Sequence, residues 1–279
     1  MSDGRILPVI HQVGAALKAK GLPVTRLRAW HVLFPLWLIL AGATAHAASD
    51  PAAPGILSVL LRWSPLLLRG FVFNIVISLL SMLLGTILGL WLGLCLVSQH
   101  SVIRAPALAA TEFFRNAPWL VLLFFVTFML PFQMEIGHFT IPFPGWIKAV
   151  LGLALAIMAN VAEIVRGAVQ SIHPGQWEAS EALGFTRSQQ MWRIILPQCI
   201  KRMIPPWMNL YAIVTMSTTL ASIIGVNEVV TLASQVQAAE GGRTDLLAPI
   251  YGYVLLLFFI YSYPISVWTR RLERKYATR

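Results

Sequence analysis

The sequence is dominated by apolar runs that are each long enough to cross a lipid bilayer as a helix. A transmembrane helix needs about 20 predominantly apolar residues to cross ~30 Å of hydrocarbon. After residue 65 the chain contains five such runs, near 70–97, 116–134, 146–167, 203–225 and 248–268. They predict an all-α polytopic membrane protein.

The composition agrees with that prediction and excludes an ordinary soluble domain. Hydrophobic residues make up 57% of the 279 residues and charged residues only 11%, whereas soluble domains carry about a quarter charged residues. The two cysteines form no CxxC pair, and the six histidines show no metal-ligand spacing. We therefore expect neither a disulfide framework nor a metal site.

Small residues recur at every fourth position of the first long run. They are Ser81, Gly85, Gly89 and Gly93. Residues four apart share one face of a helix, and small side chains on that face let a second helix approach closely. We expect this face to pack against another span rather than to line a substrate path.

A polar, charged island at residues 177–197 separates two of the apolar runs. Its sequence is WEASEALGFTRSQQMWRIILP. Residues 178–183 favour a short helix, which Gly184 can end in a left-handed backbone conformation. Thr186 or Ser188 can then cap a second, amphipathic helix. A helix, a glycine turn and another helix at a membrane boundary is a shape suited to docking into a groove on a partner.

The spacing within this island resembles the EAA loop of the permease subunits of bacterial ABC importers. That pattern is E-A-A-x3-G-x9-I-x-L-P, and the matching residues here are Glu178, Ala179, Ser180, Gly184, Ile194, Leu196 and Pro197. Ser180 replaces the second alanine. The alternative interpretation is an amphipathic connecting loop without a partner, which would not need this glutamate, glycine and proline spacing.

Four further segments, at 115–118, 159–167, 171–176 and 216–226, resemble motifs of the polar amino acid branch of these permeases. Asn160 stands where that branch usually has tyrosine. Met216 and Ser217 stand where it has lysine and aspartate, so no role of that pair carries over. The resemblance extends from about residue 63 to the C-terminus.

The resemblance implies a five-helix permease core that forms the translocation pathway of an importer for polar amino acids. The expected partners are two ATP-binding cassette subunits, a second permease that is identical or related, and a periplasmic solute-binding protein. The chain contains no Gly-Lys pair and hence no Walker A loop, so we expect ATP to be bound by the partners and no enzymatic site here. The alternatives are an importer of opines or similar nitrogen compounds, and a secondary transporter or channel.

The distribution of charge predicts the orientation. Basic residues concentrate around the docking loop and in the tail at 269–279, whereas the loops near 135–145 and 226–247 are mainly acidic. By the positive-inside rule, the docking loop and the C-terminus should lie in the cytoplasm of a cell with an inner membrane.

The residues before the permease domain (70–268) divide into three parts. Residues 1–29 are polar and basic, 30–48 are a signal-like segment or a first span, and 49–69 are a link with a stretch suited to the membrane surface. Whether residues 30–48 are cleaved as a signal or kept as a first span, we expect residue 50 to lie outside the cytoplasm.

Two groups of candidate functional residues follow. In the loop, Glu178 would couple to the ATPase by its charge, Ala179 by allowing close approach and Gly184 by its turn. For the substrate pathway we name the polar residues of spans Asn160, Glu163, Asn209 and Thr218. Their structural alternatives are an ion pair of Glu163 with Arg166, three residues away, and hydroxyl groups bonded to backbone carbonyls of their own helix.

Overall fold

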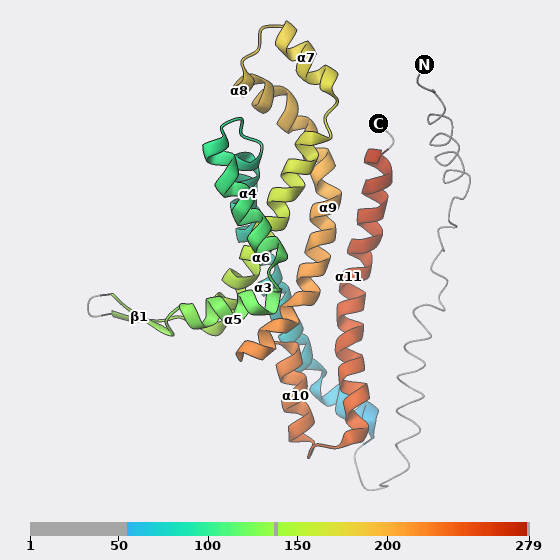
Figure 1. Ribbon diagram of the computed structural model, residues 1–279. Helices are drawn as coiled ribbons and strands as arrows, with labels where there is room; N and C mark the ends of the chain where they lie inside the picture. The colour runs from blue at the N-terminus through green and yellow to red at the C-terminus, as the bar shows by residue number, and fades with distance from the viewer. Residues whose placement is uncertain (1–54, 137–138, 278–279) are drawn as a thin grey trace, which may run out of the picture. The chain divides into compact units, whose positions relative to one another are not determined.

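Helices account for nearly all of the structure, a computed structural model that describes residues 55–136 and 139–277 (Figure 1). The α-helices are α3 (Ile56–Leu96), α4 (Ser101–Asn116), α5 (Trp119–Met129), α6 (Gly145–Gln170), α7 (Pro174–Ala182), α8 (Arg187–Gln189), α9 (Leu196–Ser217), α10 (Val229–Ala239) and α11 (Leu247–Ala277). A π-helix, η1 (Gln190–Ile195), and two 3-10 helices, η2 (Thr218–Ile224) and η3 (Thr244–Leu246), complete the helical elements. The predicted all-α class is confirmed; segments 1–29 and 30–48 lie outside the described residues.

Four stretches of the described residues are long and apolar enough to cross a membrane, and a bent pair makes a possible fifth. The four are Ile56–Leu96, Gly145–Gln170, Arg187–Ile224 and Thr244–Tyr276. The first helix starts at Ile56, so the part of the expected link from residue 56 onward is continuous with the first span. Helix α11 extends to Ala277, so most of the tail expected at 269–279 is helical and continuous with the last span.

The span expected near 116–134 is not a single helix in the structure. The chain bends by 106° between α4 and α5, and α5 by itself has 11 residues, or about 16 Å. The bend occurs at Ala117 and Pro118, which both have extended backbone. Proline lacks an amide donor and disfavours helix in the residue before it, so α4 ends there. A short antiparallel hairpin follows, β1 (Gln133–Ile136) paired with β2 (Phe139–Pro142).

A buried lysine holds the end of α5 against α6. Lys148 is fully buried, and its Nζ donates to the carbonyl oxygens of Thr127 (3.1 Å) and Leu130 (2.9 Å). The ammonium group also lies 3.6 Å from the centre of the Phe132 ring. Carbonyls at the end of a helix carry partial negative charge and lack helical donors. Lys148 supplies both the donors and the charge, which fixes the bent segment to α6.

Helices α3 and α6 pack closely along the small-residue face of α3. A Cβ built on Gly85, Gly89 or Gly93 would stand within 2.6 Å of a side-chain atom of Ile157, Val161 or Val165 on α6. Such distances lie below any normal van der Waals contact. The expected packing role of these glycines is therefore confirmed, because only hydrogen fits at these positions.

A buried polar network ties α3 to η2 and α10. Asn74 donates to Thr218 Oγ1 (3.0 Å) and to Glu228 Oε2 (2.8 Å), and its Oδ1 accepts from the Val229 amide (3.0 Å). Glu228 Oε1 accepts from the amides of Val230 and Thr231, both at 2.9 Å, and so caps α10. The sequence indicated Glu228 only as a charge in an outer loop.

The Glu228 carboxyl makes stability depend on pH. Burial raises the pKa of Glu228 above its ordinary value of 4.5, although hydrogen bonds from Asn74, Thr231 and Val230 oppose the shift. A raised folded-state pKa means that the folded protein binds the proton more tightly than the unfolded chain. The stability that this group contributes is therefore greatest below pH 4.5 and is lost as the pH rises through the raised pKa.

We expect the melting temperature of the wild type, relative to that of Glu228→Gln, to fall as the pH rises from about 4 to neutrality, because the glutamine cannot ionise. The measurement is thermal unfolding in detergent at a series of pH values. Glu181→Gln, at an exposed site, serves as the control and should leave the pH profile unchanged. A Glu228→Gln profile parallel to that of the wild type would contradict the expectation.

Candidate functional site

The docking loop begins with helix α7 and turns at Gly184. His173 Nδ1 accepts from the Gly175 amide and so caps the first turn. The helix ends at Ala182, and Gly184 takes φ +76°, with its amide donating to the Glu181 carbonyl (2.9 Å). The predicted left-handed glycine turn is confirmed.

Thr186, rather than Ser188, caps the second half of the loop. Its hydroxyl accepts from the Gln189 amide (3.4 Å), and the Gln189 side chain accepts from the Thr186 amide (2.9 Å). This reciprocal pair is a capping box. The expected single amphipathic helix is interrupted, because the short helix α8 passes into the π-helix η1 before α9 begins. A π-helical turn is rare and is found often at functional sites.

The EAA-like residues divide between an exposed face and a packed face. Glu178, Ala179 and Gly184 are exposed, whereas Ser180 is buried with its hydroxyl donating to the Trp177 carbonyl (2.8 Å). The hydroxyl at the position of the second alanine is thus satisfied within its own helix. Ile194 and Leu196 are half-buried and Pro197 is exposed.

Two large apolar side chains extend the exposed face of the loop. Leu183 is 75% exposed and Trp192 is 61% exposed. They lie on either side of the glycine turn in sequence, and Glu178 and Ala179 on α7 are exposed as well. The loop thus presents apolar groups together with a carboxylate, which suits a protein partner more than free solvent.

The loop is fastened to the spans from which it emerges. Arg202 on α9 donates to the carbonyl oxygen (2.6 Å) and hydroxyl (2.8 Å) of Ser171, at the end of α6. Ile195 and Cys199 are fully buried against the end of α6. Movement of the loop would therefore be transmitted to α6 and α9.

A second polar group lies where α4 meets α6. Glu163 accepts from Arg166 at 2.6 and 3.0 Å and lies 3.6 Å from Arg115. These residues, with Thr111 and Glu112, line a cavity of about 370 Å³. The predicted pairing of Glu163 with Arg166 is confirmed. Arg115 is an additional partner that only the bend after α4 brings near.

Glu163→Gln should lower the stability of the protein by about 1 kcal/mol, because two guanidinium groups would lose their shared carboxylate at a site that is only partly exposed. Thermal unfolding in detergent would measure the loss. Glu181→Gln removes an exposed carboxylate and should leave the melting temperature unchanged. Equal changes in melting temperature for the two substitutions would mean that the Glu163 ion pairs do not contribute to stability.

The four candidate pathway residues lie in different surroundings. Glu163 lines the cavity beside α4, and the lining does not include the other three. Asn160 donates to the Ala156 carbonyl (2.8 Å), Asn209 is exposed on α9, and Thr218 is buried with its hydroxyl donating to the Thr215 carbonyl (2.7 Å). The expected local satisfaction of the hydroxyl of Thr218 is confirmed.

This combination of apolar spans, a tightly packed helix pair and an exposed loop between two spans defines a membrane permease subunit. Residues 85–277 match the family described as the binding-protein-dependent transport system inner membrane component. The chain belongs to this family. It is a multi-pass inner-membrane permease subunit of an ABC transporter, a class that works with ATPase subunits and a binding protein and is not itself an ATPase.

Individual relatives agree with this assignment. The chain is 33% identical over 214 residues to the glutamine transport system permease protein GlnP of Escherichia coli (strain K12), covering 76% of this chain and 93% of the relative. It is 32% identical over 205 residues to the probable amino-acid ABC transporter permease protein y4tF of Sinorhizobium fredii (strain NBRC 101917 / NGR234), covering 74% and 84%.

Solved structures are also similar. One, described as the crystal structure of an amino acid ABC transporter with histidines, has a TM-score of 0.66 and 25% identity, with 78% of this chain and 99% of that chain covered. An inward-facing structure of the MetNI methionine ABC transporter has a TM-score of 0.59 and 20% identity, covering 77% and 98%. The second likeness concerns the fold alone.

Proposed function

We propose that this chain forms the translocation pathway of an importer for polar amino acids and couples it to ATP hydrolysis through residues 177–197. The observation that carries the coupling role is the exposed face of the loop, with Glu178, Ala179 and Leu183 before the Gly184 turn and Trp192 after it. The amino acid class is supported by the relatives, which include transporters of glutamine and of other amino acids.

In the proposed arrangement, two ATPase subunits dock on the loops of two permeases, identical or related. A binding protein delivers substrate from the other side. The loop and the C-terminus then face the cytoplasm, as the excess of basic residues beside them indicates. ATP is bound by the ATPase subunits and by no site of this chain.

The mechanism is a shift in population between outward-open and inward-open states. Closure of the ATPases moves the two loops. The contacts of Arg202 with Ser171, and the packing of Ile195 on α6, carry that movement into the spans. We place Asn160, Glu163, Asn209 and Thr218 among the pathway residues to be tested, and Glu163 first, since it lines the cavity beside α4.

The test is purification of the full-length chain from its native membrane, followed by mass spectrometry of the proteins that accompany it. An ATPase and a second permease are expected. The complex is then reconstituted into vesicles with its binding protein. It should transport a labelled polar amino acid only when ATP is present on the side of the membrane where the ATPase subunits lie. Uptake by the chain alone, without an ATPase, would overturn the proposal and favour a secondary transporter or channel.

A further inference from the structure

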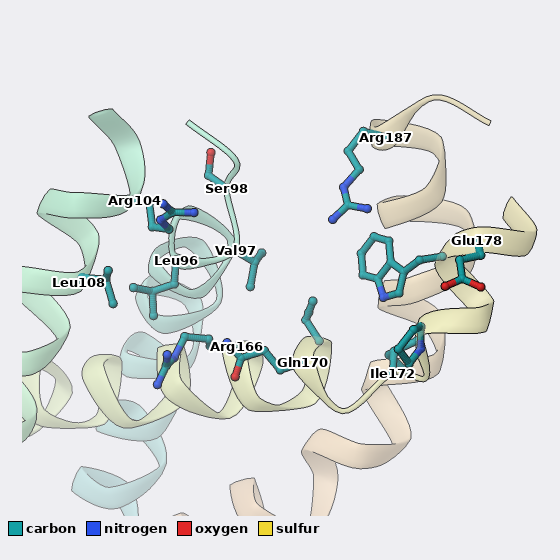
Figure 2. A pocket seen from close by; sticks show the side chains of 13 residues that line it. Leu96, Val97, Ser98, Arg104, Leu108, Arg166, Gln170, Ile172, Glu178 and Arg187 are labelled. Carbon is teal, nitrogen blue, oxygen red and sulfur yellow. The ribbon is translucent and has the colours of Figure 1, made fainter. Parts of the chain in front are cut away.

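A cavity of about 680 Å³ lies beside the docking loop, and its interior has no role in the mechanism above, although Glu178 lines it (Figure 2). One wall comes from the end of α3 and from α4. The floor is the last turns of α6, and the opposite wall is formed by α7 and the start of α8. The cavity therefore lies between the docking loop and the facing ends of α3 and α4.

Positive charge is in excess around this cavity. Three guanidinium groups contribute to it, Arg104 from α4, Arg166 from α6 and Arg187 from α8, against a single carboxylate in the lining, Glu178. Arg166 already shares a carboxylate, as it pairs with Glu163 outside the lining. Two arginines remain to attract an anion.

These two arginines stand on opposite walls. The Arg187 guanidinium lies 3.8 Å from the centre of the Trp177 ring and donates to Gln190 Oε1 (3.3 Å). Arg104 is exposed and makes no ion pair within the described residues. Figure 2 shows Arg104 on the α4 side and Arg187 on the loop side, with the cavity between them. An anion between them would contact both parts of the protein.

Apart from Ser98, the rest of the wall on the α3 and α4 side is apolar. Leu96 and Val97 end α3, and Leu108 lies on α4. Helix α3 is a candidate membrane span, and α4 belongs to the bent pair α4 and α5. Arginine binds phosphate oxygens in a bidentate manner, and basic pockets between transmembrane helices bind the head groups of anionic lipids. A basic cavity with an apolar wall at the end of a span therefore matches an anionic phospholipid better than a wholly polar solute.

We propose that this cavity binds the phosphate group of an anionic phospholipid, held between Arg104 and Arg187 with its acyl chains along the half-buried Leu108 of α4. The bound phosphate bridges the docking loop to α4 and stiffens the connection between them. Anionic lipid then supports coupling of the ATPase to the pathway. This consequence for coupling rests on the proposed function; the binding site itself does not.

The experiment is native mass spectrometry of the full-length permease, purified in mild detergent with its ATPase, after addition of equal amounts of phosphatidylglycerol and phosphatidylcholine. We expect selective retention of phosphatidylglycerol. Arg104→Gln with Arg187→Gln should weaken that retention by about tenfold or more, because two charge-assisted phosphate contacts are lost. Arg104→Lys with Arg187→Lys should keep most of it, since the charge remains.

The matched control is Arg270→Gln with Arg271→Gln. These residues are exposed near the basic end of α11 and lie outside the cavity. The control removes the same charge from the chain and should leave retention unchanged. Glu178→Gln should strengthen retention, because it removes the one carboxylate in the lining. Size-exclusion chromatography of each variant confirms that the complex is intact.

Three results would overturn the proposal. If the Arg104 and Arg187 pair and the Arg270 and Arg271 control pair lose phosphatidylglycerol equally when changed to glutamine, the lipid is attracted by net charge and not by the cavity. Displacement of the lipid by millimolar inorganic phosphate would assign the cavity to a soluble oxyanion. If the isolated permease retains phosphatidylglycerol but its complex with the ATPase does not, the ATPase occupies the cavity in the complex. If no ATPase co-purifies, the proposed function fails, while lipid retention by the permease chain is still measured.

Discussion

Gly184→Val should strongly reduce coupled transport while leaving the permease inserted in the membrane. Gly184 has φ +76°, a region that a β-branched residue rarely adopts, and no atom lies within 4 Å of the position of an added Cβ. The cost is therefore backbone strain, about 1–3 kcal/mol. The loop can relieve it only by changing the angle between α7 and α8. Since 1.4 kcal/mol is a factor of ten in a population, we expect uptake to fall by about tenfold or more.

Asparagine at the same position separates strain from side-chain size. Asparagine tolerates the left-handed region, so Gly184→Asn should retain most of the transport activity. ATP-dependent uptake in vesicles and co-purification of the ATPase are the two measurements. Normal uptake by Gly184→Val, or equal loss in both variants, would show that the turn is not what positions the docking face.

Gly89→Leu should strongly destabilise the packing of α3 against α6. A Cβ at Gly89 would stand 2.6 Å from Val161 Cβ and 2.7 Å from the Met158 carbonyl oxygen. The second contact is with backbone, so no change of rotamer relieves it, and α3 and α6 must separate. Overpacking typically costs 1–3 kcal/mol, and we expect about 3 kcal/mol here. Thermal unfolding in detergent and the yield of monodisperse protein would measure it.

Gly167→Leu is the matched control for that prediction. Gly167 lies in α6, and nothing stands within 4 Å of its added Cβ. Leucine is also a better helix former than glycine by up to about 1 kcal/mol. The control variant should be as stable as the wild type or slightly more stable. Similar losses in the two variants would mean that leucine in a span, rather than the α3–α6 contact, is responsible.

Local features of this protein follow from sequence spacing because they depend on neighbours in the chain. The turn at Gly184, the cap at Thr186 and the pairing of Glu163 with Arg166 each involve residues within four positions of one another. The small-residue face of α3 was also predictable. Helical periodicity fixes that face, and a close partner is the usual reason for small residues on it.

Contacts between distant segments were not predictable in the same way. Lys148 caps α5 across the β hairpin, and Arg115 reaches Glu163 because α4 ends at a bend. Arg104 and Arg187 face one cavity although 83 positions separate them in sequence (187 minus 104). In the sequence each of these residues reads only as a basic group near the end of an apolar run.

The sequence by itself determined the class of this protein. Apolar runs of spanning length allow few alternatives to membrane helices, and the Glu178 to Pro197 spacing indicated the ABC permease family that residues 85–277 then matched. The tertiary structure alone decided how the polar residues are used. Thr218 and Glu228 join a buried network through Asn74, and the second span bends instead of crossing straight. Spacing along a helix fixes which residues share a face, but the partner of that face is set by packing between segments far apart in the chain.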